Sequence, residues 1–355
     1  MNIKFIDYGA SYNRHKAEYD QAWERVNTDG KLILQEDVEE FEKKLASYIG
    51  VKYAVGVNSG TDALFLSLKA MGVGPGDEVI TVSNTFKATI TAIMHTGATP
   101  VIVDIGIDYL MDPAKVVAAI TPKTRVIIPV HLSGDVCAME KIMDIAQRYN
   151  LDVVEDTAQA LGGEYAGKKA GSFGTTGCFS FYPAKILGCF GDAGAVTTND
   201  PLLANELKEL RNHYKLQPGG LGYNSRLDNL QAAVLNVKLK YLPEILAHRK
   251  VVAEYYNENL KGTGDIVLPP NRQGKVWQDY IIRVRRRDEL AEFLKAEGIG
   301  TMTPPVLPHK ELGLEFELPK TESYNLEYLR LPCNPEVTPE QAEYVVAKIK
   351  EFYPR

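Results

Sequence analysis

The chain has 355 residues, of which 45% are hydrophobic and 24% are charged, and its formal net charge is −6. These values are typical of a folded globular enzyme with room for one large and one smaller domain. The negative charge argues against nucleic acid or an acidic membrane as a partner.

Targeting and metal signals are missing from the sequence. The four cysteines lack the spacing of metal ligands, so we predict no metal site, reduced thiols and a cytoplasmic location. Residues 1–8 do not resemble a signal peptide, and no apolar run approaches the roughly 18 residues that span a membrane. We therefore expect no membrane partner.

Strand-like runs alternate with amphipathic helical runs through the first half of the chain. This rhythm predicts an α/β fold with a mostly parallel sheet flanked by helices. Two later runs lie close enough in sequence to pair antiparallel. The predicted strands are residues 52–57, 79–82, 100–104, 125–131 and 151–154, the helices 63–68, 113–120 and 138–149, and the antiparallel pair 178–182 with 195–198.

Helical content rises after residue 201, and residues 227–260 read as a long helix interrupted near Pro243. We place the domain boundary there, which gives a large domain with an N-terminal arm (1–243) and a smaller α+β domain (244–355). The smaller domain has a predicted strand at 280–284, helices at 288–297 and 339–352, and an ordered proline-rich loop at 303–309.

The first candidate site residues follow the strand at 52–57. Gly60 and Thr61 lie just before the predicted helix at 63–68, and free backbone N–H groups and the dipole at a helix N-terminus bind an anion such as phosphate. Ser180 adds a hydroxyl from another strand end. Plain helix capping explains the same residues, and neither a P-loop nor a dinucleotide-binding fingerprint is present.

Asp156 follows the strand at 151–154, at the edge of the sheet where ligands of α/β proteins bind. A carboxylate there can hold a cationic ring nitrogen, such as that of pyridoxal 5′-phosphate (PLP), and so keep the ring an electron sink. The alternative is a helix N-cap, a common role for aspartate after a strand.

Lys185 leaves a buried strand through a turn that contains Pro183 and enters the glycine-rich residues 188–195. Desolvation disfavours the ammonium form, and a neutral amine can attack a carbonyl carbon. The alternative is an ordinary surface lysine.

Five ordered motifs carry a resemblance to a known family. They are residues 58–64 (NSGTDAL), 83–86 (SNTF), 154–160 (VEDTAQA), 180–185 (SFYPAK) and 222–228 (GYNSRLD). The chain resembles, from about residue 4 to 353, the DegT/DnrJ/EryC1/StrS family of PLP-dependent nucleotide-sugar aminotransferases. The resemblance implies the fold type I of aspartate aminotransferase, with a mostly parallel seven-stranded sheet in the large domain.

The resemblance also implies roles for single residues. Lys185 becomes the Schiff-base lysine, and Asp156 pairs with the pyridine nitrogen. The cofactor phosphate is expected to contact Gly60, Thr61 and Ser180. Phe86 is expected to stack on the cofactor ring, and Gln159 to bond the ring hydroxyl. Asn224 is expected to reach the cofactor phosphate in the active site of the partner subunit. The expected substrate contacts are Arg226, Tyr182 and His309. For Phe86 a place in the core, and for His309 a purely structural role, remain alternatives.

The implied reaction uses PLP, with pyridoxamine 5′-phosphate as its intermediate form, to move an amino group from glutamate to a nucleotide-linked keto sugar. The implied assembly is a homodimer with shared active sites. Lys185 predicts a transaminase, because sugar 3-dehydratases of the family carry histidine at that position. Residues 191–194 (GDAG) resemble the family members that aminate C3 more than those that aminate C4, so the resemblance favours amination at C3.

Departures from the family pattern at Lys87, Leu161 and Ile186 leave the substrate subgroup open. Two alternative functions also stay open. One is a PLP enzyme of the same fold that acts on a substrate without a nucleotide. The other is a non-catalytic sensor of the cofactor or of a sugar nucleotide.

Overall fold

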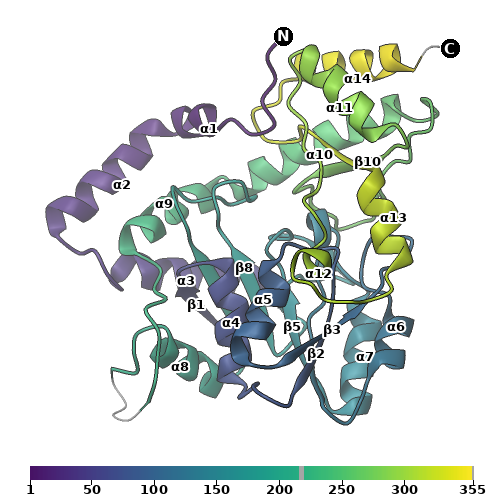
Figure 1. The fold of residues 1–355 in the computed structure, drawn as a ribbon. Helices are drawn as coiled ribbons and strands as arrows, with labels where there is room; N and C mark the ends of the chain where they lie inside the picture. The colour runs from purple at the N-terminus through teal and green to yellow at the C-terminus, as the bar shows by residue number, and fades with distance from the viewer. Residues whose placement is uncertain (216–219, 354–355) are drawn as a thin grey trace.

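The computed structural model describes residues 1–215 and 220–353. A large sheet with helices on both faces fills one half of the molecule, and the C-terminal helices lie above one end of it (Figure 1). The helices are α1 (Tyr8–Arg14), α2 (Lys16–Asp29), α3 (Glu36–Ile49), α4 (Gly60–Ala70), α5 (Ala88–Thr96), α6 (Pro113–Ala119), α7 (Met139–Tyr149), α8 (Pro201–Leu210), α9 (Asn229–Lys240), α10 (Leu242–Asn259), α11 (Arg287–Ala296), α12 (Pro308–Glu311), α13 (Pro319–Glu327) and α14 (Pro339–Phe352), with a 3₁₀ turn η1 (Leu132–Gly134). The strands are β1 (Tyr53–Val57), β2 (Glu78–Val82), β3 (Thr99–Val103), β4 (Thr124–Ile127), β5 (Asp152–Asp156), β6 (Glu164–Tyr165), β7 (Lys168–Lys169), β8 (Thr176–Ser180), β9 (Gly194–Thr198), β10 (Tyr280–Arg283) and β11 (Tyr328–Leu331).

The main sheet has seven strands in the order β1-β9-β8-β5-β4-β2-β3. Only β9 runs against its neighbours, so the prediction of a mostly parallel sheet with an antiparallel β8–β9 pair is confirmed. Strands β5 and β8 are parallel neighbours, with Asp156 opposite Cys178. Their carboxyl ends therefore lie side by side and bring Asp156 close to the segment that begins at Ser180.

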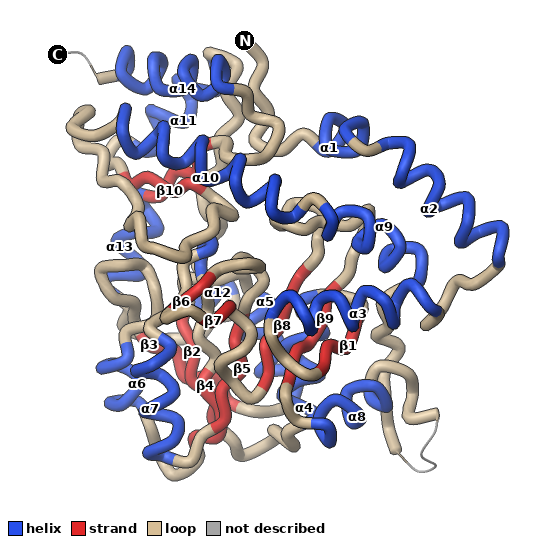
Figure 2. The backbone as a smooth tube through the Cα atoms, turned by 180° about the vertical axis from the view of Figure 1, so that it is seen from behind, coloured by secondary structure: helices blue, strands red, loops and turns tan. Residues whose placement is uncertain are grey.

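Helices bury both faces of this sheet (Figure 2). Apolar side chains of α4, α5 and α8 form one core with β1, β2, β5, β8 and β9. On the other face, α3 and α9 pack over the β1–β9–β8 side, while α6 and α7 pack over the β3–β2–β4 side. The strands are buried on both sides, which explains their nearly continuous apolar sequences.

The C-terminal elements surround their own core. Strands β10 and β11 pair antiparallel, and α10, α11 and α14 contribute to the same apolar cluster. Ile3 joins this cluster, and its backbone bonds Gly298 and Gly300 at 2.8 and 2.7 Å. The start of the chain therefore packs on the C-terminal elements. The domain division at residue 243 stays a prediction.

Some predicted boundaries shift for identifiable reasons. Strand β4 ends at Ile127 rather than at residue 131, because Pro129 has no N–H group for the ladder. The break in the long helix falls at Tyr241, and Pro243 stands in the first turn of α10, where a missing N–H costs nothing. The predicted loop at 303–309 ends in a short helix, since α12 begins at Pro308.

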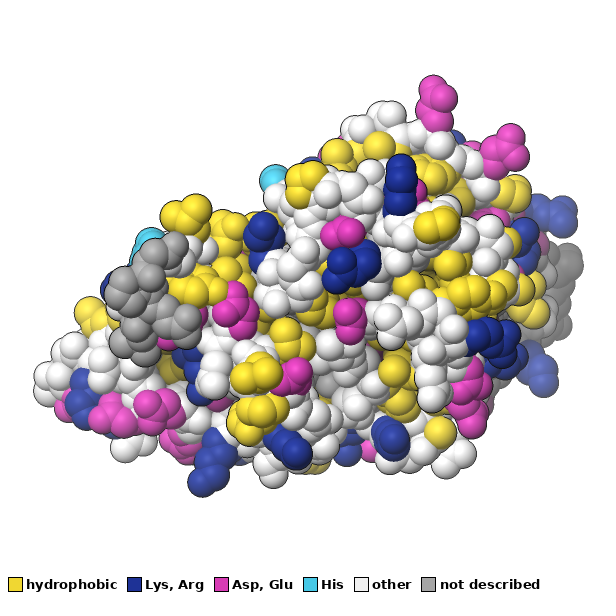
Figure 3. All heavy atoms as spheres, turned by 90° about the horizontal axis from the view of Figure 1, so that it is seen from below, with side chains coloured by type: hydrophobic (Ala, Val, Ile, Leu, Met, Phe, Trp, Pro, Cys, Tyr) yellow, Lys and Arg dark blue, Asp and Glu magenta, His cyan; other side chains and the backbone are white. Residues whose placement is uncertain are grey.

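Surface and cysteine chemistry are unexceptional. In the face drawn in Figure 3, basic and acidic side chains are interspersed. Within residues 1–215 and 220–353, no helix combines the length and apolar character that a bilayer crossing requires. Cys137, Cys178, Cys189 and Cys333 are buried and free of disulfide bonds. The cytoplasmic location inferred from the sequence stays a prediction.

Candidate active site

Asp156 ends β5 and is buried at the carboxyl edge of the sheet. Its Oδ2 accepts a hydrogen bond from Thr89 Oγ1 at 2.8 Å, and its Oδ1 accepts one from Ala158 N–H at 3.2 Å. Burial raises the pKa of this carboxyl, while the hydrogen bonds and the charge of Lys185 act in the opposite direction. No helix begins after Asp156, so the helix-cap interpretation is wrong.

The neighbouring Glu155 points to the other side of β5 and anchors the strand end. Its carboxylate accepts backbone N–H bonds from Gly171, Phe173 and Gly174, each at 2.8 Å. His131 Nε2 lies 3.1 Å from the same carboxylate, and His131 Nδ1 accepts the N–H of Cys137. A buried, fully bonded carboxylate of this kind holds the end of β5, and Asp156 with it, in one position.

The start of α4 forms the second part of the site. Ser59 is the N-cap, because its Oγ accepts the N–H of Asp62 at 3.1 Å, so the capping interpretation is correct for Ser59. Within the described residues, the N–H groups of Gly60 and Thr61 have no partner. A Cβ atom at Gly60 would lie 2.6 Å from Ser180 Cβ, so only glycine allows this approach. The three residues predicted at the phosphate therefore lie together.

Lys185 lies in the segment between β8 and β9, and its side chain is partly buried. Its backbone N–H bonds Tyr182 O at 2.8 Å. Burial lowers the pKa of the Lys185 amine, and the carboxylates of Asp279 and Asp156 oppose that shift. The amine therefore lies within electrostatic reach of both carboxylates, which is inconsistent with an ordinary surface lysine.

Three further predicted site residues, Gln159, Phe86 and Tyr182, have atoms that a ligand can contact. Gln159 Oε1 accepts the N–H of Ser133 at 2.8 Å, and no partner for its Nε2 occurs in the described chain. Phe86 is 58% exposed between β2 and α5, so the alternative that places it in the core is wrong. Tyr182 is also exposed, three residues before Lys185. These groups are free to contact a bound molecule.

Asn224 and Arg226 flank a residue that binds the segment to α4. Ser225 is buried, and its Oγ donates to Asp62 Oδ2 at 2.7 Å. Asn224 is exposed, whereas Arg226 Nη1 donates to Asn212 Oδ1 at 3.2 Å. Residues 216–219 of the glycine-rich loop that precedes them lie outside the described residues.

His309 belongs to α12 and is 1% exposed. Its Nδ1 lies 2.7 Å from Ser83 Oγ, and its Nε2 lies 3.4 Å from Glu322 Oε1. In this conformation the ring is not accessible to a substrate. Its placement supports the structural role, in which it joins the end of β2 to the C-terminal elements.

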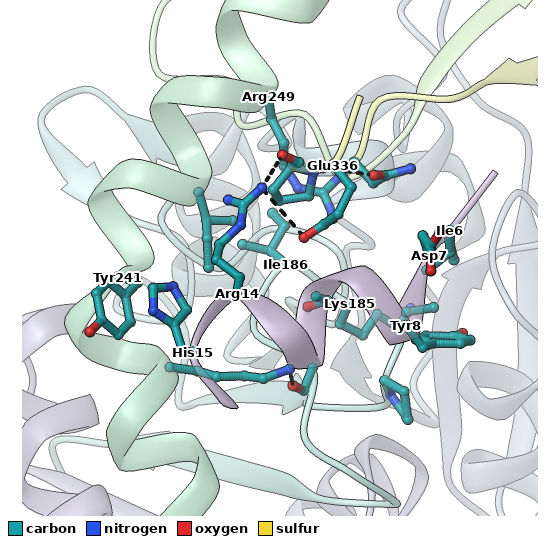
Figure 4. Close-up of a pocket in the computed structure, with 18 of the residues that line it drawn as sticks. Ile6, Asp7, Tyr8, Arg14, His15, Lys185, Ile186, Tyr241, Arg249 and Glu336 are labelled. Atoms are coloured by element: carbon teal, nitrogen blue, oxygen red, sulfur yellow. Dashed lines mark hydrogen bonds and ion pairs between the residues drawn. The ribbon is translucent and has the colours of Figure 1, made fainter. Parts of the chain in front are cut away.

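A pocket that is open to solvent borders the Lys185 segment. It lies between the N-terminal arm and α10, and Figure 4 shows Arg14 directed toward Glu336 and His15 lying against Tyr241. Arg14 donates to Pro335 O at 2.6 Å and lies 3.6 Å from Glu336. No site residue was predicted in the N-terminal arm, which nevertheless forms one wall beside Lys185.

Four residues near these groups were not found from the sequence. Thr89 bonds Asp156, Ser133 bonds Gln159, and Gln278 and Asp279 reach the Lys185 segment from the start of β10. Ser133 adopts a φ of 53°, a left-handed conformation that is uncommon outside glycine. No spacing signal could reveal them, because they approach from elements far apart in the sequence.

The arrangement fits PLP at each of its reactive parts. An amine of lowered pKa suits a covalent bond to the aldehyde, and a buried carboxylate suits a cationic ring nitrogen. Unpartnered N–H groups at a helix start, beside a serine, suit a phosphate. A large α/β domain with such a site defines the class of PLP-dependent transferases of fold type I.

Comparison with known proteins narrows this class. The sequence profile of the DegT/DnrJ/EryC1/StrS aminotransferase family matches residues 13–350. The chain is 42% identical to the dTDP-3-amino-3,4,6-trideoxy-alpha-D-glucose transaminase of Streptomyces venezuelae, covering 99% of this chain and 97% of that protein. It is 43% identical to the "Pleiotropic regulatory protein" of Geobacillus stearothermophilus, covering 99% of each. The chain belongs to the DegT/DnrJ/EryC1/StrS aminotransferase family.

Solved structures agree with this assignment. DesV of S. venezuelae, in complex with a ketimine intermediate, superposes with a TM-score of 0.97 at 42% identity, covering 100% of this chain and 99% of that chain. NtdA of Bacillus subtilis, with bound cofactor PMP, gives a TM-score of 0.93 at 32% identity, covering 100% and 86%. The predicted fold type I is confirmed.

Proposed function

We propose that this chain is a PLP-dependent aminotransferase that transfers the amino group of glutamate to C3 of a nucleotide-linked 3-keto sugar. The strongest support is that Lys185, Asp156 and the free N–H groups of Gly60 and Thr61 converge at the carboxyl ends of β8, β5 and β1. The 3-amino-sugar transaminase among its relatives supports the position of amination. The sequence of residues 191–194 favours the same position.

Each site residue has a proposed task. PLP, when bound, supplies an electron sink for the carbanion at the donor α-carbon. The Lys185 amine would hold PLP covalently until the amine of the donor displaces it. The freed Lys185 amine would then take the proton from the donor α-carbon and deliver it to the cofactor C4′. The ionised Asp156 would hold the proton on the ring nitrogen of bound PLP. Positioned proton transfer of this kind contributes about 10²–10⁴-fold to the rate.

The remaining contacts orient the cofactor and the sugar. Gly60, Thr61 and Ser180 bind the phosphate, and Gln159 offers its free Nε2 to the ring hydroxyl. Phe86 is exposed and available to stack on the ring. Tyr182 is the proposed sugar contact on this chain. We leave His309 out of the proposal because its ring is buried.

The substrate assignment is tested with a panel of dTDP-, UDP- and GDP-linked 3-keto and 4-keto sugars, each supplied with glutamate. We expect amine formation, measured by mass spectrometry, on a 3-keto sugar, with 2-oxoglutarate released in equal amount. Exclusive amination of 4-keto sugars would contradict the C3 assignment. A keto sugar without a nucleotide is added to the panel as a control, and turnover of that compound alone would contradict the nucleotide-sugar assignment.

The sensor alternative has one observation in its favour, which is the regulatory name of the Geobacillus relative. A sensor has no need to keep a buried carboxylate and an amine of lowered pKa in electrostatic reach of each other. The enzyme is therefore the better-supported function. Tight sugar-nucleotide binding with no amination of any sugar in the panel would favour the sensor.

The proposed assembly is a homodimer in which Asn224 and Arg226 enter the partner's site. Ser225 anchors this segment to α4 of its own chain, so contribution to the chain's own site is the competing arrangement. An inactive Lys185→Ala chain mixed with an inactive Arg226→Ala chain distinguishes the two. With shared sites, each heterodimer has one intact site and recovers roughly half of a wild-type dimer's activity. Subunit exchange without any recovery would contradict shared sites.

A further inference from the structure

The backbone around Lys185 has no regular secondary structure to hold it. Between β8 and β9 it forms a turn in which Lys185 N–H bonds Tyr182 O and Cys189 N–H bonds Phe181 O, both at 2.8 Å. Neither bond uses the two groups that flank the lysine, Ala184 C=O and Ile186 N–H. Buried backbone groups of this kind require partners.

Gln278 supplies both partners with one side chain. Its Oε1 accepts the N–H of Ile186 at 2.8 Å, and its Nε2 donates to the C=O of Ala184 at 2.9 Å. The orientation of the amide is fixed, because the oxygen must face the donor and the nitrogen must face the acceptor. Gln278 is 7% exposed, its bond to Ile186 is buried and its bond to Ala184 is partly buried. Together they fix the peptide groups on both sides of Lys185.

Gln278 is itself held from the C-terminal elements. Arg249 of α10 places Nη1 3.0 Å from the carbonyl oxygens of Trp277, Gln278 and Cys333. Arg249 is 5% exposed, and among the described residues no carboxylate lies within ion-pair distance of it. Figure 4 shows it on the wall of the pocket above Lys185 and Ile186. Its bonds therefore fix the backbone from which the Gln278 side chain extends.

We propose that Gln278 is a positioning residue for the Lys185 amine, and that it fixes this amine through the backbone of Ala184 and Ile186. The inference rests on the proposed role of Lys185. That role requires the Lys185 amine to reach the carbonyl carbon of the cofactor and, later, the proton on the α-carbon of the donor. A displacement of about 1 Å at such a group costs about 10²-fold in rate.

Gln278→Met tests this, because methionine keeps the length of the side chain and removes both hydrogen bonds. The chain offers a matched control. Gln231 of α9 makes a comparable pair of bonds, both to Phe190: its Oε1 accepts the Phe190 N–H at 3.1 Å, and its Nε2 donates to Phe190 O at 3.4 Å. Gln231→Met therefore removes a comparable amide contact to the same loop, at a residue five positions beyond Lys185.

The first readout needs no cofactor. Competitive acetylation of the cofactor-free protein, followed over pH by peptide mass spectrometry, gives the pKa of the Lys185 amine. Burial lowers that pKa in the wild type. In Gln278→Met we expect it to rise toward its ordinary value, because the released loop lets the amine reach water. We expect no change in Gln231→Met.

The second readout is steady-state kinetics of the holoenzyme. Gln278→Met should lower kcat by about 10²-fold and leave the KM of the sugar nucleotide unchanged, since the change affects the reacting amine and not binding. Gln231→Met should retain the wild-type kcat. Equal Lys185 pKa values and equal kcat values in the two variants would overturn the proposal.

Gln278→Glu provides an independent test, including the case in which Gln278→Met does not fold. A protonated carboxyl has one donor and one acceptor and can reproduce the amide's two bonds, whereas the ionised form loses the donor. Burial raises the pKa of the introduced carboxyl. Activity relative to wild type should therefore be highest at acid pH and fall as pH rises through that pKa. A pH profile parallel to that of the wild type would refute the positioning role.

Failure of the proposed function would look different. If the cofactor is attached to a lysine other than Lys185, the assignment of the catalytic lysine fails whatever the Gln278 variants do. If the cofactor is attached to Lys185 and the Gln278 variants behave like the control, only the positioning role fails.

Discussion

Replacement of Lys185 by alanine should abolish amino transfer and leave the protein folded. The side chain lies in a loop outside the helices and strands, so its removal breaks no secondary structure. The substitution removes both the covalent attachment of the cofactor and the group that moves the proton. We therefore expect kcat to fall by at least the roughly 10²–10⁴-fold that positioned proton transfer contributes. The measurement is kcat with the accepted sugar nucleotide, together with the melting temperature.

Lys168→Ala is the control, because Lys168 is exposed at the β6–β7 hairpin. It should retain the wild-type kcat. Lys185→Ala should still bind PLP weakly through its phosphate and ring contacts, without the absorbance of the lysine-bound cofactor. A Lys185→Ala protein that keeps more than a small fraction of wild-type turnover would contradict the assigned role.

Replacement of Asp156 by asparagine should have the second largest effect. A neutral amide is almost isosteric with the carboxyl group and can still accept the hydrogen bond of Thr89. It cannot hold the proton of the ring nitrogen, so the cofactor should bind while kcat falls by about 10²-fold or more, as when a preorganised charge is removed from an active site. Near-normal turnover would mean that Asp156 serves only to shape the end of β5.

Although Asp156→Asn should lower activity, it should raise the stability of the cofactor-free protein. Burial raises the pKa of Asp156 above its ordinary value of 3.8. A raised pKa contributes stability that is present below the unfolded pKa and is lost as pH rises through the folded pKa. Removing the carboxyl should therefore help the cofactor-free protein more at pH 8 than at pH 4. Melting temperatures of both proteins at the two pH values test this.

Equal pH dependence of the two melting temperatures would contradict the proposed cost of the buried carboxylate. If the buried Asp156 carboxylate does destabilise the cofactor-free protein, bound PLP would offset that destabilisation in the wild type by placing a positive ring nitrogen beside the carboxylate. The added PLP should then raise the melting temperature of the wild type more than that of Asp156→Asn.

The sequence was sufficient to predict the sheet and the strand-end residues, because each depends on local pattern. Apolar runs between turn signals located β1, β2, β3, β5, β8 and β9, and the place of Asp156 after a strand implied the carboxyl edge of the sheet. Boundaries shifted where a single residue intervened, as Pro129 does after β4.

Contacts between distant segments could not be predicted in this way. Gln278 forms hydrogen bonds with Ala184 and Ile186, which lie 94 and 92 residues before it in the sequence. Such contacts depend on how the C-terminal elements pack against the sheet. Burial also decided between alternatives: Phe86 proved exposed, which leaves it available to stack on the ring, whereas His309 proved buried, which favours its structural role.

The most direct measurement is the position of the cofactor on the chain. The purified protein should be yellow with bound PLP, and borohydride should remove the absorbance band and fix the cofactor on one lysine. Two other lysines are chemically plausible, because burial lowers the pKa of Lys238 and of Lys275 to about 8. Peptide mapping by mass spectrometry should find the cofactor on Lys185. Its attachment to Lys238, Lys275 or any other lysine would contradict the assigned active site.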